Sequence, residues 1–156
     1  MTQTAHNLTP DAQAELAAAL NQSVAETVVA TMLAQNFHWN VKGMAFGPLH
    51  QLFQEIYEDH FEGQDSLAER IRALGAHANG QLGEMVKAAK IEERDGTETA
   101  EEMIAHMAEA ERTLAATVAG AAAVASRAGD LLTEDLCIER GRTHEKFAWM
   151  LSAHLQ

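Results

Sequence analysis

Four long stretches of the 156-residue chain repeat apolar residues at every third or fourth position, which is the spacing of one face of an α-helix. Proline, which interrupts helices, occurs only at Pro10 and Pro48. Alanine, leucine, glutamate, glutamine and methionine, which favour helices, are abundant. The sequence therefore predicts an all-α fold built from four long helices.

Capping residues mark where these helices begin and end. Thr9 is a suitable N-cap before Pro10, Thr99 and Glu102 match a capping box, and Gly129 is a typical helix stop. The expected helices run from Pro10 to Phe37 or His38, from near Pro48 to Gly75, from residues 97–99 to Gly129, and from Asp130 or Thr133 to the end of the chain.

Each helix has an expected buried stripe. In the first helix the stripe is Leu16, Leu20, Val24, Val28 and Met32, and in the second it is Leu49, Phe53, Ile56, His60, Gly63, Leu67 and Leu74. In the third it is Ile104, Met107, Leu114, Val118, Ala121 and Ala125, and in the fourth it is Leu136, Thr143, Phe147 and Met150. Four such stripes can enclose one core.

A long connection, from Gly75 to Gly96, separates the second and third helices and contains a candidate short helix over residues 82–89. It is long enough to return the chain to the opposite end of a bundle. The pattern therefore predicts a ferritin-like four-helix bundle with a long crossover between helices two and three. We expect one domain over residues 1–156, with residues 1–8 as a flexible N-terminal segment.

Composition narrows the class of protein. The net charge is −12, and acidity of this size opposes non-specific binding to nucleic acid. Cys137 is the only cysteine, so an intrachain disulfide and a thiolate metal cluster are both excluded, and a reducing, cytoplasmic setting is the default. Neither a secretory signal nor a membrane span is expected.

The candidate chemistry lies in His38, His50, Asp65 and Glu69, because imidazole and carboxylate together suit ferrous iron, zinc or manganese. None of the eight histidines follows a glutamate by three positions, so a di-iron centre of the Glu-x-x-His type within one bundle is not expected. His50 and Asp65 lie 15 residues apart on one helix, or roughly 22 Å at the helical rise. One ion could reach both residues only if two copies of the helix packed antiparallel about a two-fold axis.

The stretch over residues 38–43 begins a series of residue types at fixed spacing. The series continues with Phe46, Leu49, His50, Phe53, Tyr57, Asp65 and the run over residues 68–70. This series resembles the signature of the Dps family, the mini-ferritins named as DNA-binding proteins from starved cells.

The resemblance implies a hollow homo-dodecamer of ferritin-like bundles that protects against oxidative damage. It implies a ferroxidase that oxidises Fe²⁺ with hydrogen peroxide or O₂ and deposits Fe³⁺ in the cavity. It also implies a ligand set with His38 and His50 from one subunit and Asp65 and Glu69 from its two-fold partner. Zinc is a substitute that this set of donors would also hold.

Gln54 departs from the family pattern, which usually has aspartate at this position. An amide is a weaker iron ligand than a carboxylate, so we expect one tightly bound metal in each site and a loosely held second one. Trp39 adjoins His38 and is a second accessory candidate, although packing at the helix end is the simpler role for it.

Acidic residues Asp130, Asp135 and Glu139 near the start of the last helix could form rings around a three-fold axis and draw cations inward. The equally weighted alternative is that they are acids favoured by the helix dipole. The remaining histidines are assigned structural or surface roles. They are His6, His60, His77, His106, His144 and His154.

Three rival functions stay open besides ferroxidase and iron storage. The first is a DNA-protecting, nucleoid-associated shell, which is disfavoured because residues 1–15 contain no lysine or arginine and the chain ends at Gln156 without a basic extension. The second is a zinc- or metal-buffering shell with little ferroxidase turnover. The third is a purely structural bundle, which would leave the histidine and carboxylate set unexplained.

Overall fold

The computed structural model describes residues 7–156, and the described part contains helices and no strands. The helices are α1 (Pro10–Asn40), α2 (Phe46–Ala73), α3 (Leu82–Ala88), α4 (Ala100–Ala128) and α5 (Leu131–Ser152), followed by the 3₁₀ turn η2 (Ala153–Leu155). The predicted all-α class is therefore confirmed. Most of the predicted N-terminal segment, including His6, lies outside the described residues.

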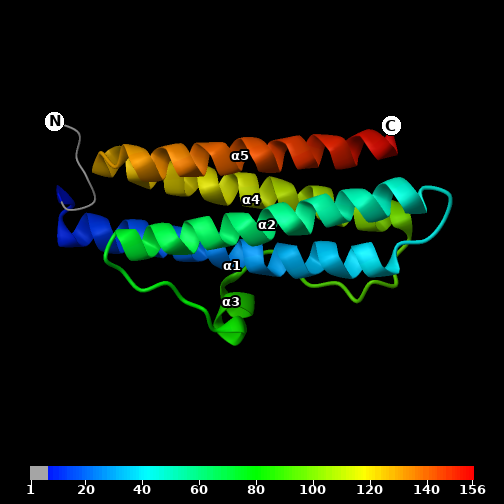
Figure 1. Ribbon diagram of the computed structural model, residues 1–156, viewed down its shortest axis with the longest axis horizontal. Helices are drawn as coiled ribbons and strands as arrows, with labels where there is room; N and C mark the ends of the chain where they lie inside the picture. Colours follow the sequence, from blue (N-terminus) through cyan, green and yellow to red (C-terminus); the bar gives the residue numbers. More distant parts are fainter. Residues whose placement is uncertain (1–6) are drawn as a thin grey trace.

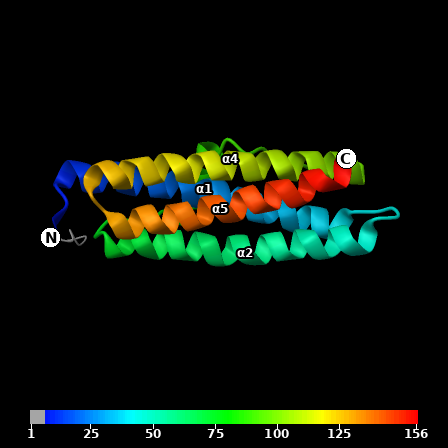
Figure 2. The ribbon, with the colours of Figure 1, turned by 90° about the horizontal axis from the view of Figure 1, so that it is seen from above.

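The four long helices lie side by side along one axis, with α3 outside the bundle beside α1 (Figure 1). α1 pairs with α2, α4 pairs with α5, and α1 also packs on α4. α2 and α4 run in the same direction, so the connection between them travels back along the bundle past α1 (Figures 1 and 2). This is the crossover predicted for a ferritin-like bundle.

Local capping explains the helix boundaries. The Thr9 side chain accepts a hydrogen bond from the Ala12 amide at 3.2 Å. Thr99 and Glu102 form a complete capping box at the start of α4. Gly129 ends α4 with a φ of 73°, a left-handed conformation that favours glycine.

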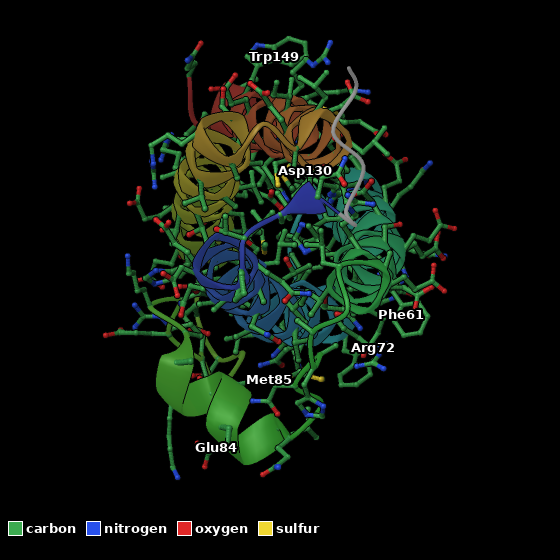
Figure 3. All side chains as sticks on the ribbon, turned by 90° about the vertical axis from the view of Figure 1, so that its left-hand side faces the viewer. Phe61, Arg72, Glu84, Met85, Asp130 and Trp149 are labelled. Carbon is green, nitrogen blue, oxygen red and sulfur yellow. The ribbon has the colours of Figure 1, made fainter. Side chains whose placement is uncertain are left out.

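Polar side chains of α1 hold the crossover against the bundle. The Glu26 carboxylate is fully buried and accepts hydrogen bonds from the amides of Lys90 at 2.8 Å and Ile91 at 3.1 Å. Gln22 donates to the Ala88 carbonyl at the end of α3. Met85 is the buried residue of α3 and points toward the bundle (Figure 3). Glu26 therefore satisfies backbone groups of the crossover that would otherwise lie buried without partners.

The predicted stripes of α2 and α4 are buried throughout, whereas two positions of the α1 stripe are not. Val28 is only partly buried and Met32 is 46% exposed. Residues four positions apart in a helix are displaced by about 40° around its axis. A stripe that repeats every fourth residue for four steps therefore turns away from the core. Ala30, Leu33 and Phe37 take the buried positions instead.

The predicted stripe of α5 is also partly wrong. Leu136, Thr143 and Met150 are only partly buried, while Cys137, Arg140 and His144 face the interior. Polar residues occupy two of these interior positions, so the apolar pattern pointed one residue away from the true face.

One helix, α1, is long and apolar enough to cross a membrane by length and composition alone. In the bundle, 61% of its most apolar window is buried inside the structure. This burial is what the core helix of a helical bundle requires.

Candidate metal centre

His38, at the end of α1, and His50, in the first turns of α2, lie against each other. Their rings stack with centroids 3.7 Å apart and planes 17° from parallel. Nδ1 of His38 donates to the His50 carbonyl, and Nδ1 of His50 donates to the His38 carbonyl, each at 2.7 Å. The short connection between α1 and α2 thus brings together two histidines that lie 12 positions apart in the chain.

These reciprocal hydrogen bonds fix the tautomer of both rings. A carbonyl oxygen can only accept, so Nδ1 must carry the proton in each bond. The Nε2 atom of each neutral ring then has a free lone pair. Protein-bound metal ions are typically held by histidines whose other ring nitrogen donates to a carbonyl in this way.

Aromatic neighbours restrict the histidine pair further. Tyr57 of α2 meets the edge of His38 with centroids 5.3 Å apart, and Phe46 stacks on His50 at 5.0 Å. His38 is 9% exposed and His50 is only partly buried, so the pair lies at the surface of the α1–α2 hairpin. Trp39 is 60% exposed and is not packed at the helix end.

Asp65 and Glu69 are exposed, one helical turn apart, on the distal half of α2. Within residues 7–156 neither carboxylate has a hydrogen bond or an ion pair. α2 is one continuous helix over this stretch, so the separation from His50 stays at roughly 22 Å within one chain. The fold therefore brings the two histidines together and leaves the two carboxylates apart from them.

Gln54 lies one turn after His50 and is only partly buried. Its side-chain amide donates to Glu58 Oε1 at 2.8 Å. This hydrogen bond turns the NH₂ group toward Glu58. The carbonyl oxygen of Gln54 is then the side-chain atom that could coordinate a metal.

The three candidate pore residues differ in their surroundings. Asp130 is 2% exposed, caps the N-terminus of α5 and accepts two hydrogen bonds from Arg70, at 2.9 and 3.0 Å. Burial favours the neutral acid, but hydrogen bonds from Thr133 and Arg70 outweigh it and lower the pKa of Asp130. Within the subunit Asp130 therefore caps α5 and pairs with Arg70, and a place for it in a pore stays a prediction. Asp135 and Glu139 are exposed on α5 and stay candidates.

A second cluster was missed by the sequence-based assignment. His60 of α2, Glu111 of α4 and His144 of α5 are each 0% exposed and meet in the interior of the bundle. The apolar pattern indicates His60 and Glu111, which occupy positions of the buried faces of α2 and α4, but it does not indicate His144. Glu111 follows Met107 by four positions and precedes Leu114 by three.

The ionisation of this cluster follows from burial and contact. Burial would raise the pKa of Glu111, but attraction to His60 and the hydrogen bond with His144 outweigh it, so the pKa lies below its ordinary value. Burial lowers the pKa of His144 against the opposing effect of Glu111. For Cys137, burial, reinforced by the charge of Asp130, raises the pKa to about 11, so its thiol is neutral near pH 7.

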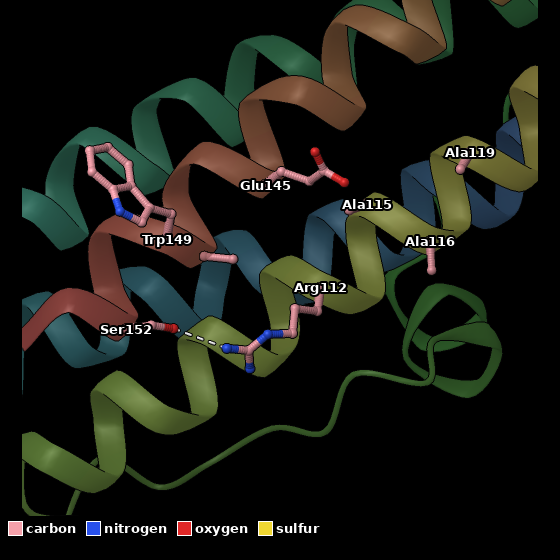
Figure 4. A pocket seen from close by; sticks show the side chains of 8 residues that line it. Arg112, Ala115, Ala116, Ala119, Glu145, Trp149 and Ser152 are labelled. Carbon is pink, nitrogen blue, oxygen red and sulfur yellow. Dashed lines mark hydrogen bonds between the residues drawn. The ribbon is translucent and has the colours of Figure 1, made fainter. Parts of the chain in front are cut away.

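A groove of about 530 Å³ lies between α4 and α5 (Figure 4). Its floor consists of alanines 115, 116, 119 and 148, and Arg112 donates to Ser152 at 3.0 Å at one end. Trp149 borders the groove and points away from the bundle (Figures 3 and 4). The lining contains neither histidine nor aspartate, so the groove offers no metal-binding set.

Comparison with known proteins settles the family. The ferritin-like domain family matches residues 17–156. The DNA protection during starvation protein of Brevibacillus brevis is 37% identical over 143 residues, covering 90% of this chain and 95% of that protein. The crystal structure of a Dps protein from Bacillus brevis superposes with a TM-score of 0.91 at 34% identity, over 96% of this chain and 100% of that one.

The chain is a member of the Dps family.

Two further proteins match over most of the chain. General stress protein 20U of Bacillus subtilis is 33% identical over 90% of this chain and 97% of its own length. The Dps protein from Vibrio cholerae O1 superposes with a TM-score of 0.92 at 31% identity, over 100% of this chain and 98% of that one. That protein is described as a member of a broad superfamily of ferritin-like diiron-carboxylate proteins.

Proposed function

We propose that this Dps protein is a mini-ferritin that oxidises Fe²⁺, preferably with hydrogen peroxide, and stores the ferric product inside a hollow dodecamer. The active sites would lie between two-fold related subunits, each formed by His38 and His50 of one chain and Asp65 and Glu69 of the other. Family membership supports the role in iron storage and protection. The observation that carries the proposal is the histidine pair, whose Nδ1 atoms are both committed to carbonyls.

One arrangement of two subunits would bring the two halves of the ligand set together. If two copies of α2 pack antiparallel, His50 and Asp65 come level when the two-fold axis passes midway between them, near Tyr57 and Glu58. Asp65 and Glu69 are exposed and have no hydrogen-bond or ion-pair partner among residues 7–156, so they are available to meet a partner's histidines. An isologous contact would produce two such sites per dimer.

Exposed apolar surface supports a partner on this side of the molecule. Phe61, close to the proposed axis, is 64% exposed and projects outward from α2 (Figure 3). A groove of about 490 Å³ between α1 and α3 has Met32, Leu82 and Val86 in its lining, and all three are exposed. Burying such surface in a two-fold interface would stabilise the dimer, with a favourable free energy of about 25 cal/mol for each Å² of apolar surface removed from water.

The proposed chemistry follows from the ligand types. Carboxylates favour the harder ferric ion, so Asp65 and Glu69 would ease the loss of an electron from Fe²⁺. Two ferrous ions would each give one electron to the O–O bond of one peroxide, which is reduced to the level of water without releasing a hydroxyl radical. Water would supply the remaining oxygen of the ferric oxyhydroxide, and the protons would leave to solvent.

Gln54 limits how the iron is held. An uncharged amide oxygen, with its NH₂ group bound to Glu58, would give the second iron of each site a weak ligand. One tightly bound ferrous ion and a transient second one would then meet the two-electron demand of peroxide. Asp135 and Glu139, exposed on α5, would attract cations toward the interior if they surround a three-fold pore.

A zinc-buffering shell is the second candidate. Two imidazoles and two carboxylates form a typical zinc-binding set, so zinc could occupy the same site and block iron turnover. A DNA-protecting shell is suggested by the name of the Brevibacillus brevis relative, but the net charge of −12 opposes contact with phosphate.

The direct test is iron oxidation by the assembled wild type and by His50→Ala and Asp65→Ala shells. Each protein is loaded with Fe²⁺ without oxygen and then given peroxide, with ferric absorbance and particle mass followed in parallel. We expect both substitutions to slow oxidation at least ~100-fold while the particle mass stays unchanged, an effect of the size seen when a metal site loses supporting groups. His106→Ala, on α4 away from the site, is the matched control. Wild-type rates in either site variant, or a zinc-filled wild type that never turns over iron, would contradict the proposal.

A further inference from the structure

The interior cluster of His60, Glu111 and His144 joins three helices, α2, α4 and α5. One ligand atom from each side chain lies within 4.8 Å of the other two. His60 is 10 residues, or roughly 15 Å along α2, from His50, so this cluster is separate from the histidine pair at the surface.

The hydrogen bonding of the cluster is incomplete. His144 Nδ1 and Glu111 Oε2 form a hydrogen bond at 2.8 Å. His60 Nε2 lies 2.8 Å from Glu111 Oε1, the distance of an ion pair. Among residues 7–156, Nδ1 of His60 and Nε2 of His144 are buried without a hydrogen-bond partner. Buried polar groups almost always have partners, so these orphaned nitrogens require an explanation.

Neighbouring charges leave room for a cation. Arg140 approaches from α5, but it is paired with Asp59 of α2 through hydrogen bonds of 3.1 and 2.6 Å, which offset its charge. Phe147 contacts His60 edge to face, with centroids 6.3 Å apart, and supplies an apolar wall. The Glu111 carboxylate thus lies at the centre of the bundle between the rings of His60 and His144.

We propose that His60, Glu111 and His144 form a second metal site, lying within each subunit and specific for a divalent transition-metal ion such as Zn²⁺. Two imidazoles and one carboxylate are a common protein ligand set for this class of ion. The ion would bind one nitrogen of each imidazole and one oxygen of Glu111. It would also tie α2, α4 and α5 together, so binding raises the thermal stability of the subunit.

The rival explanation is a metal-free ion pair in which protonated His60 faces the Glu111 carboxylate. Both explanations place the same side chains in contact, so a localised metal signal is needed to separate them. The interface ligands must also be removed, because they would bind zinc themselves.

The test therefore uses assembled His50→Ala/Asp65→Ala shells, stripped with a chelator and then exposed to Zn²⁺. Anomalous diffraction at the zinc edge is expected to place one ion per chain among His60, Glu111 and His144. Titration with Co²⁺ should give the visible absorption of a low-coordinate, imidazole-ligated ion. Adding Glu111→Gln should abolish both signals and the zinc-dependent rise in melting temperature, whereas adding His106→Gln on α4 should leave them unchanged.

Two results would overturn the proposal. One is an anomalous map of the His50→Ala/Asp65→Ala shell with no peak at the cluster, a measurement that does not depend on whether Glu111→Gln folds. The other is a folded Glu111→Gln shell that still binds the ion there. Neither result bears on the proposed ferroxidase site, because two of its four ligands, His50 and Asp65, are absent from this protein.

Discussion

The two surface histidines show how backbone contacts can prepare a side chain for chemistry. His38 and His50 each donate from Nδ1 to the other's carbonyl. These contacts leave Nε2 of each ring available to bind a metal, whether or not a metal is present. The sequence pointed to both residues but could not reveal this exchange, which depends on the turn between α1 and α2. The sequence indicates Asp65 and Glu69 only through their four-residue spacing. Their contact with a partner's histidines stays a proposal.

At Gln54 we predict that a single substitution changes the iron stoichiometry. Gln54→Asp replaces a weak amide ligand with a carboxylate one turn from Glu58, and the repulsion between the two acids is relieved by a cation between them. In an anaerobic Fe²⁺ titration, the number of tightly bound ions per site should rise from one in the wild type to two in the variant. Gln54→Asn is the control and should keep one. Two equally tight ions in the wild type would show that Gln54 is not limiting.

Asp130 gives a prediction on acid stability. Its pKa is lowered in the folded protein, so the folded state binds fewer protons here than the unfolded state. Its contribution is therefore complete above the ordinary aspartate pKa and is lost as the pH falls through the lowered value. Asp130→Asn should destabilise the subunit by about 1–3 kcal/mol near pH 7, because Arg70 loses its charged partner.

The measurement is the melting temperature of both proteins between about pH 7 and pH 3, across the ordinary aspartate pKa. The difference between them should shrink toward the acid end of this range. Glu134→Gln, one turn into α5, is a control that should show little difference at any pH. A gap between wild type and Asp130→Asn that stays constant with pH would exclude the assigned role of Asp130.

At the scale of elements, helix order and the crossover could be predicted because capping residues and glycines mark the boundaries. The structure extends the predicted first helix by two or three residues to Asn40 and begins the second at Phe46 rather than at Pro48. The buried face of α5 was harder to predict. Arg140 and His144 lie in its interior, and an apolar pattern cannot select polar residues that are buried through partners on other helices.

α2 and α5 approach each other mainly through such polar pairs. Arg140 reaches Asp59, Arg70 reaches Asp130, and the Arg140 guanidinium crosses the backbone at Gly63. A Cβ at Gly63 would lie 2.6 Å from the Arg140 guanidinium carbon. A glycine is therefore needed at position 63 because a larger residue would collide with Arg140. Its position in the predicted apolar stripe does not indicate this reason.

For the whole molecule, one chain contains all the ligands of the proposed ferroxidase site but cannot bring them to one ion. His50 and Asp65 lie on a single straight helix, so only a second copy could complete the site. A shell of such acidic subunits would also repel nucleic acid and attract cations. The single-chain fold follows from the sequence, whereas the assembly depends on surface complementarity that sequence patterns describe only through resemblance.

Complementation between two inactive variants tests this central claim most directly. In a mixed dimer of His50→Ala and Asp65→Ala chains, one site carries both substitutions and the other carries neither. Shells assembled from equal amounts of the two variants should therefore recover about a quarter of the wild-type rate of iron oxidation, since half the dimers are mixed and each has one intact site. A mixture as inactive as either variant alone, in shells that mass measurement shows to be mixed, would contradict a site shared between subunits.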